Sequence, residues 1–232
     1  MTLLICPVRP GDDNPELRYA LRSWEANLIM SDLTLMVVGD RPTWLEPDGF
    51  VEGNRFEGQA NVWDNVALGC DRANWDDDEE VVIMNDDFFC LDPVPGVVAV
   101  RRDMTLADHI ALYPQYRGMW WVRSLDLTAS WLADEGHPSP WSYEVHRPLP
   151  CKPADMLESL ARWTGGMDGD IPQWRTVYGT LNKIDAHPVG DVKFGSVQTP
   201  VPSAWRSTSD TSWRKYAKPI VERFQKPSRW ER

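Results

Sequence analysis

The first half of the chain contains short apolar runs separated by polar loops and amphipathic segments. Apolar runs at residues 3–6, 33–38 and 81–84 have the length and composition of strands buried in a parallel sheet. A weaker extended segment lies near residues 50–51. Polar residues follow each of the three runs, so we expect the carboxyl ends of these strands to form one polar edge, where ligands bind in α/β sheets.

Two amphipathic helices are predicted between these strands. Asn14 suits the N-cap of the first helix, and Pro15 suits its first position. One face of this helix carries Leu17, Ala20, Leu21, Trp24 and Leu28, and one face of the second carries Ala60, Trp63, Ala67 and Cys70. Strands and helices that alternate in this way predict an α/β fold of Rossmann type, with a mostly parallel sheet flanked by helices.

The second half of the chain is less regular. Its pattern predicts strands at residues 96–100 and 141–145, and helices at residues 106–112, 120–133, 153–163 and 172–181. Asp170 is the expected cap of the last of these helices. The remainder is rich in proline and has little periodicity. We therefore divide the chain into one domain, residues 1–200, and an irregular C-terminal arm, residues 201–232, packed on that domain.

Composition agrees with one globular domain. A chain of 232 residues with 42% hydrophobic content can bury a full core. No segment approaches the ~18 uninterrupted apolar residues of a membrane span, and the first apolar run is too short for a signal peptide. The four cysteines are scattered without a CxxC pair, which indicates reduced thiols. We expect a cytoplasmic protein that does not contact membranes.

The charge is unevenly distributed. The net charge of −11 argues against a broad nucleic-acid-binding face. Residues 1–200 carry 32 acidic and 16 basic side chains, whereas residues 201–232 carry 3 acidic and 8 basic ones. The basic arm either folds back onto the acidic body or reaches an anionic ligand. Thirteen tryptophans are many for this length, and aromatic walls suit sugars and nucleobases.

The third apolar run ends abruptly at Asn85, Asp86 and Asp87. Two adjacent carboxylates at the carboxyl end of a strand suit a hard divalent cation, Mn²⁺ or Mg²⁺, which in turn can hold a diphosphate. The simpler alternative is a solvated turn that closes the strand, because Asn and Asp are common in turns. The chain has neither GxGxxG nor GxxxxGK[ST], so dinucleotide and P-loop sites are both disfavoured.

Three segments resemble the second conserved block of the Stealth family, the hexose-1-phosphate transferases of capsule synthesis. They are ELRYALRSWEAN at residues 16–27, MVVGDRPTWL at residues 36–45 and VVIMNDDFF at residues 81–89. The chain also resembles small actinobacteriophage glycosyltransferases in its PVRPG start, its NDD motif and its KPSxxE ending. Both resemblances imply a GT-A type fold, and they cover residues 3–92 best. The first Stealth block is absent, so glycosyl transfer ranks above sugar-phosphate transfer.

The resemblance implies a nucleotide-sugar site at the polar edge. The expected contacts with the nucleotide sugar come from Pro7, Val8, Arg9, Asp40, Arg41, Asn65, Asn85 and Asp86. Arg9 can pair with the diphosphate as a fork donor, or alternatively form a surface ion pair with Asp12 or Asp13. Asp86 and Asp87 would be the metal ligands, and Asn85 would orient one of them or bind ribose.

A proton acceptor for the incoming hydroxyl is expected in the second half of the chain. Glu144 and His146 are two residues apart in an extended segment and so share a face. His146 begins a His-x-Pro that is similar to the later Stealth block, and a late histidine of this kind can also complete the shell of the cation. Asp168 is a further candidate base, and a structural role is the alternative for each of the three.

These resemblances imply an enzyme, a metal-dependent glycosyltransferase that moves a sugar from a UDP- or GDP-sugar to an acceptor hydroxyl. If a phage encodes it, the acceptor would be a virion protein or a hydroxymethylated DNA base in the host cytoplasm. One alternative is a Stealth-like sugar-1-phosphate transferase. An alternative of another class is a non-catalytic carbohydrate-binding virion module. The sequence leaves the sugar, the stereochemical outcome and the oligomeric state open.

Overall fold

The chain forms a central five-stranded sheet with helices on both faces. The computed structural model describes residues 1–11, 13–73, 79–195 and 202–232. The sheet has the order β3-β2-β1-β4-β7. Its strands are β1 (Thr2–Val8), β2 (Leu33–Gly39), β3 (Gly49–Glu52), β4 (Val81–Ile83) and β7 (Leu149–Cys151). The first four pair in parallel and β7 runs antiparallel to β4, which confirms the mostly parallel α/β sheet.

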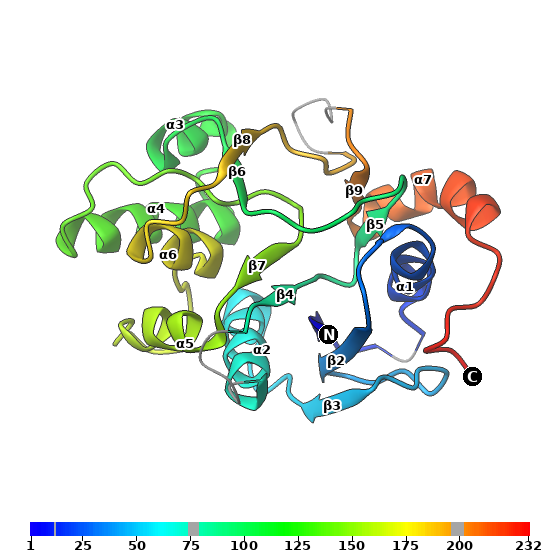
Figure 1. The fold of residues 1–232 in the computed structure, drawn as a ribbon. Coiled ribbons are helices and arrows are strands. Elements are labelled where there is room, and N and C mark those ends of the chain that lie inside the picture. The colour runs from blue at the N-terminus through cyan, green and yellow to red at the C-terminus, as the bar shows by residue number, and fades with distance from the viewer. Residues whose placement is uncertain (12, 74–78, 196–201) are drawn as a thin grey trace.

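Helices cover the two faces of this sheet in separate groups (Figure 1). On one face lie α1 (Pro15–Asn27) and α7 (Asp210–Arg223), and on the other lie α2 (Gly58–Ala73), α5 (Pro153–Ala161) and α6 (Trp174–Leu181). As predicted, Asn14 caps α1, because its Oδ1 accepts a hydrogen bond from the Leu17 N–H at 3.1 Å.

The alternation of side chains along the strands divides the core in two. Leu4, Cys6 and Val8 of β1 pack with α1 and α7, whereas Leu3 and Ile5 pack with α2, α5 and α6. All five side chains are buried. Each short strand therefore supports both hydrophobic cores, which is why these runs are apolar at every position except Thr34.

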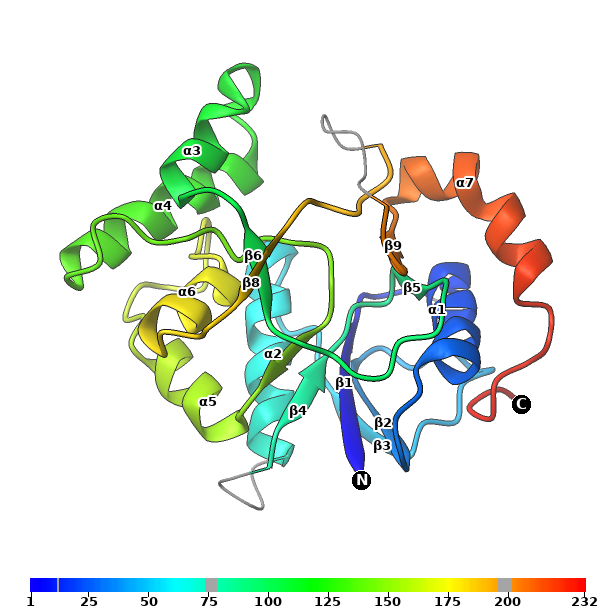
Figure 2. The ribbon, with the colours of Figure 1, turned by 45° about the horizontal axis from the view of Figure 1, so that its top comes forward.

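A second layer lies beyond the carboxyl edge of the sheet, at the end opposite the N-terminus (Figure 2). It contains two small strand pairs, β5 (Phe88–Cys90) with β9 (Trp205–Ser207) and β6 (Val100–Arg102) with β8 (His187–Val189). It also contains α3 (Leu106–Ala111), the 3₁₀ turn Pro114–Tyr116 and α4 (Trp120–Asp134). None of the described helices is long and apolar enough to cross a bilayer.

The C-terminal arm packs closely on the domain. Besides β9 and α7, which the sequence pattern did not predict, it contributes Trp230, whose side chain is 1% exposed in the core on the α1 face. Arg22 of α1 forms an ion pair with Glu231 at 2.7 Å. The arm is thus a structural part of the sheet's outer layer.

Three predicted elements of the second half need correction. The segment 141–145 is not a strand, although Trp141 makes an isolated bridge to Thr105. The strand predicted at 96–100 lies instead at Val100–Arg102. The last predicted helix begins at Trp174 with Gln173 as its N-cap, and Asp170 pairs with Arg123 instead of capping it.

Candidate functional site

The acid motif lies at the carboxyl edge of the sheet. β4 ends at Ile83, the Met84 N–H donates to the Ile5 carbonyl at 2.8 Å, and a turn closes where the Phe88 N–H donates to the Asn85 carbonyl at 3.2 Å. Asp86 and Asp87 occupy this turn, each with a side chain 14% exposed. Their position beyond β1 and β4 is the one at which α/β sheets bind ligands.

Asp86 is held from the α1 side of the site. Its Oδ2 accepts a 2.8 Å hydrogen bond from Nδ2 of Asn14 and lies 3.4 Å from Nε of Arg9. Burial, together with the charge of Asp87, raises the pKa of Asp86 to about 6 despite these donors. Burial is thus the main cost of ionising Asp86, and the charge of Asp87 adds to it.

Asp87 is held by the C-terminal arm. Its Oδ2 accepts a 2.7 Å hydrogen bond from the hydroxyl of Ser207 in β9 and lies 3.7 Å from Nζ of Lys193. The β5–β9 pairing brings Ser207 to this position from 120 residues away. Among the described residues, the Oδ1 atoms of both Asp86 and Asp87 have no hydrogen-bond or ion-pair partner.

The two Oδ1 atoms are the possible ligands of a divalent cation at this turn. In the described part of the chain, no three His, Cys, Asp or Glu side chains form a group that could hold a metal ion. Mg²⁺ is commonly bound by one or two carboxylates together with substrate phosphates and water. Asp86 and Asp87 fit that mode, and the metal role of His146 stays a prediction.

Arg9 leaves β1 toward this site and contacts two acids. Its guanidinium forms an ion pair with Glu16, which is 2% exposed, and approaches Asp86. Glu16 also accepts from the Thr208 hydroxyl. Burial raises the pKa of Glu16, while Thr208 and Arg9 oppose this. The predicted alternative partner Asp13 forms no ion pair with Arg9, and Asp12 lies outside the described residues.

Asn65 supports the edge of the sheet from α2. The side chain is 1% exposed; its Oδ1 accepts from the Asn54 N–H at 3.1 Å, and its Nδ2 donates to the Asn54 Oδ1 at 2.9 Å. Asn54 in turn donates to the Val8 carbonyl at 3.2 Å. Gly39 fits against this network at φ +118°, where a Cβ atom would lie 2.2 Å from the Val8 oxygen. Asn65 thus fixes the loop after β3, and nucleotide contact by it stays a prediction.

The other residues predicted on the first two loops lie around the same edge. Pro7 and Val8 are buried in β1, next to the exposed Arg9. Asp40 accepts a hydrogen bond from the Gly11 N–H at 2.9 Å, which links the loops after β1 and β2. The exposed Arg41 stacks over Phe50, 5.2 Å from its centroid. This edge is therefore continuous from β3 to β4.

His146 belongs to a chain of charged groups that the sequence pattern did not reveal. Its Nδ1 lies 2.8 Å from Oδ1 of Asp191, and Oδ2 of Asp191 lies 2.8 Å from a guanidinium nitrogen of Arg102. Burial alone would raise the pKa of Asp191, but His146 and Arg102 hold it well below its usual value. Burial and then Lys193 lower the pKa of His146, which favours a neutral imidazole with Nε2 free of Asp191.

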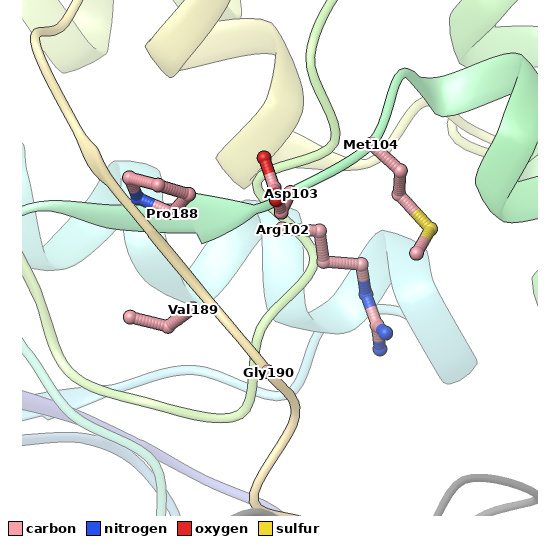
Figure 3. Close-up of a pocket in the computed structure, with 6 residues that line it drawn as sticks. All are labelled: Arg102, Asp103, Met104, Pro188, Val189 and Gly190. Atoms are coloured by element: carbon pink, nitrogen blue, oxygen red, sulfur yellow. The ribbon is translucent and has the colours of Figure 1, made fainter.

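Arg102 anchors this chain from β6. It lines a cavity of about 280 Å³ together with Asp103, Met104 and residues 188–190 (Figure 3). Figure 3 shows the Arg102 and Asp103 side chains on opposite sides of the strand end, so only Arg102 is directed toward the interior. The Arg102 side chain also donates to the Glu144 carbonyl at 2.8 Å, which ties the segment before His146 to β6.

Arg175 is a buried cation beside the acid motif. It is 5% exposed in α6, donates to the Arg147 carbonyl at 2.9 Å and lies 3.5 Å from Oδ1 of Asn85. It forms no ion pair among the described residues, and burial lowers its pKa to about 10. The Nε of Arg147 is likewise buried without a partner in the described structure. A buried arginine without an ion-pair partner favours an anionic ligand, although the charges of Glu144 and Asp87 partly offset the burial of Arg175.

The other two predicted bases are Glu144 and Asp168. Glu144 accepts hydrogen bonds from the N–H and the hydroxyl of Thr176 at 3.1 and 2.9 Å, so it holds the first turn of α6. Burial raises the pKa of Glu144. Asp168 is exposed and lines a groove of about 610 Å³ between the starts of α2 and α4. Catalysis by either carboxylate stays a prediction.

No family model and no curated protein matches this chain. Among solved structures, the apo form of mouse xyloside xylosyltransferase 1 can be superposed with a TM-score of 0.38 and 9% sequence identity. That match covers 99% of this chain and 96% of the mouse chain. The chain is therefore similar to a known transferase only as a loose superposition, and its function has to be inferred from the site itself.

Proposed function

We propose that this protein is a glycosyltransferase that uses a nucleotide-sugar donor and a divalent cation, Mn²⁺ or Mg²⁺. One observation carries the proposal. Two adjacent, mostly buried carboxylates, Asp86 and Asp87, lie at the carboxyl edge of a mostly parallel sheet, and the Oδ1 of each has no hydrogen-bond or ion-pair partner among the described residues. A bound cation would supply Lewis-acid stabilisation of the leaving diphosphate. The raised pKa of Asp86 supports this, because burial and the charge of Asp87 disfavour its ionised form and a bound cation would offset both.

The cations around the motif suit the two phosphates of the donor. Arg9 approaches Asp86 from β1, Lys193 approaches Asp87, and the buried Arg175 approaches Asn85. Arginine forks bind phosphate oxygens with two parallel hydrogen bonds. In our proposal these three side chains hold the diphosphate, and the nucleoside lies along the edge formed by the loops after β1, β2 and β3.

His146 is the proton acceptor in this proposal. The contact with Asp191 fixes the ring and leaves Nε2 to take a proton from the acceptor hydroxyl. The lowered pKa of His146 keeps the imidazole neutral near pH 7, as a base requires. Asp191 then stabilises the imidazolium that forms when the proton arrives. Arg102 keeps Asp191 ionised and oriented.

A donor screen tests the function. The protein is incubated with Mn²⁺ and a panel of UDP- and GDP-sugars, and the released nucleotides are separated and identified. We expect one donor to yield a nucleoside diphosphate, with release lost on addition of a chelator. Asp87→Ala should abolish release, whereas Asp92→Ala, which alters an exposed carboxylate paired with Arg223 nearby, should not.

Other products of the same screen would overturn the proposal. Release of a nucleoside monophosphate would identify a sugar-1-phosphate transferase instead. Glycan binding that Asp87→Ala leaves unchanged, with no nucleotide released from any donor, would identify a non-catalytic carbohydrate-binding module.

A further inference from the structure

A groove of about 610 Å³ opens between three segments that the acid motif does not use. Its walls are residues 55–59 at the start of α2, the first turn of α4, and residues 167–171 before α6. This volume lies within the range of about 300–1,000 Å³ that is typical of small-molecule sites. The groove therefore has room for a sugar-sized ligand.

Trp120 gives the groove an open aromatic wall. Its side chain is 48% exposed, and it makes no ring or cation contact with any other described residue. The next residue, Trp121, instead packs against Tyr113 with ring centroids 4.8 Å apart. An exposed indole face without a partner is the surface on which the apolar face of a sugar ring stacks.

Asp168 gives the same groove a free hydrogen-bond acceptor. It is exposed and has no hydrogen bond or ion pair within the described structure. Glu57 is a second carboxylate of the lining without an ion pair in the described structure, whereas Arg123 pairs with Asp170 and Arg55 pairs with Asp64. Since both arginines are already neutralised, the lining suits a neutral polyol better than a phosphate or a nucleic-acid backbone.

The groove is linked to the acid motif by contacts of the first turn of α6. Gln59 in the groove donates to the side chain of Gln173 at 3.0 Å. Two residues later, Arg175 lies beside Asn85. A helix rises about 1.5 Å per residue, so one turn of α6 joins the two sites. Both lie at the carboxyl edge, because α2 begins where β3 ends.

We propose that this groove binds a pyranose ring of an acceptor glycan, with Trp120 stacked on the ring and Asp168 accepting hydrogen bonds from its hydroxyls. The role of this glycan as the acceptor rests on the proposed function, whereas the binding of a sugar in the groove does not. The substrate class is therefore a carbohydrate chain, and the hydroxyl that reacts belongs to a sugar.

A binding experiment without donor or cation tests this site. The full chain, labelled with ¹⁵N at its indoles, is titrated with a panel of methyl pyranosides and short oligosaccharides and followed by NMR. We expect at least one sugar to shift the Trp120 indole signal. Trp120→Ala and Asp168→Asn should each weaken binding by about tenfold or more, measured by calorimetry.

Two matched controls use residues of similar exposure outside the groove. Trp141→Ala removes an indole that is 43% exposed, and Asp126→Asn removes an exposed carboxylate of α4. Neither should change sugar affinity. UDP and GDP binding in the presence of Mn²⁺ should be equal in wild type, Trp120→Ala and Asp168→Asn. The proposal for the groove and the proposal for the donor site can therefore be refuted independently.

Several outcomes would overturn the proposal. Sugar binding that persists unchanged in Trp120→Ala would place the ligand elsewhere. Sugar binding that the matching nucleotide sugar displaces would assign the groove to the donor. A shift of the Trp120 signal by 5-hydroxymethyldeoxycytidine, with none by any pyranoside, would assign it to a DNA base.

Discussion

The Nδ2 of Asn14 donates a 2.8 Å hydrogen bond to Oδ2 of Asp86, 72 residues further along the chain. The same amide caps α1 through its Oδ1. Asn14 adopts φ 28°, a region that asparagine enters more readily than most residues. One side chain therefore joins the start of a helix to the acid motif, and its identity matters for both.

Replacing Asn14 should affect stability and ionisation together. Asn14→Ala loses the cap, which costs about 0.5–2 kcal/mol, and places alanine at positive φ. It also removes a donor that lowers the pKa of Asp86, so that pKa should rise further. Urea unfolding and carboxyl NMR titration measure the two effects. Asn14→Gly relieves the backbone strain, so it should recover part of the stability that Asn14→Ala loses but should leave the pKa of Asp86 raised. Full recovery of both the stability and the pKa would contradict the role of the amide.

Asp86 should make the apo protein less stable as the pH rises. Because its folded-state pKa of about 6 lies above the ordinary value of 3.8 for an aspartate, its ionisation in the fold is a cost at neutral pH. The stability it contributes is complete below the unfolded pKa and is lost as the pH rises through about 6. Without cation, Asp86→Asn should therefore be more stable than wild type at pH 7, by roughly 1–3 kcal/mol. This difference in stability should vanish near pH 4. An Asp86→Asn variant less stable than wild type at pH 7 would contradict the prediction.

Cation binding should depend on the same titration. A ligand carboxylate must be deprotonated, so Mn²⁺ affinity should level off above about pH 7 and fall as the pH drops through about 6. Calorimetric titrations between pH 5 and pH 8 measure this profile. Asp92→Asn, on the neighbouring loop, should bind as wild type does. A pH-independent affinity would exclude Asp86 as a ligand.

Asp191 should act through His146. Asp191→Asn removes the carboxylate that orients the imidazole, and turnover should fall by about 10²–10⁴-fold if His146 is the base. In wild type, the acid limb of the pH–rate profile should lie below the usual histidine pKa of about 6.5, because burial and Lys193 lower the pKa of His146. The variant should move that limb lower still, because Asp191 raises the pKa of His146. Asp191→Asn should leave the KM for the donor unchanged. The control variant Asp103→Asn should turn over at the wild-type rate.

Trp230 should be essential to the fold. Its ring is 1% exposed, and its Nε1 donates to Asp48 at 2.9 Å. Trp230→Ala should cost about 3–5 kcal/mol in the free energy of unfolding. Chemical denaturation measures this loss, with Trp141→Ala as the exposed control. A loss no larger than that of the control would show that the arm does not support the core.

The elements set by local pattern were predictable. The apolar runs of β1, β2 and β4 face two cores, so each is apolar at every position except Thr34, and the cap at Asn14 is a local signal. The strand predicted at residues 141–145 was wrong, because the prediction rested on the alternation of Tyr143 and Val145. Tyr143 instead packs against Gly179, where a Cβ atom would lie 2.5 Å from its ring, and it donates to the Ile184 carbonyl at 2.9 Å.

The acid motif could be read from the sequence, but its surroundings could not. Asp87, Asn85 and Arg9 follow predicted strands, and the parallel sheet brings strand ends together. Asp191 lies in an irregular segment and Ser207 lies in the short strand β9, and the positions of both depend on long-range contacts. Arg175 did carry a signal, since it is the only charged residue within α6.

Ser207 and Thr208 reach Asp87 and Glu16 from a segment that the ribosome makes long after the strands of the sheet. A nascent chain that ends at Cys151 already contains every strand of the central sheet, yet neither hydroxyl is present. The contacts of Ser207 with Asp87 and of Thr208 with Glu16 can thus form only after residue 208 has been synthesised, long after the strands of the sheet.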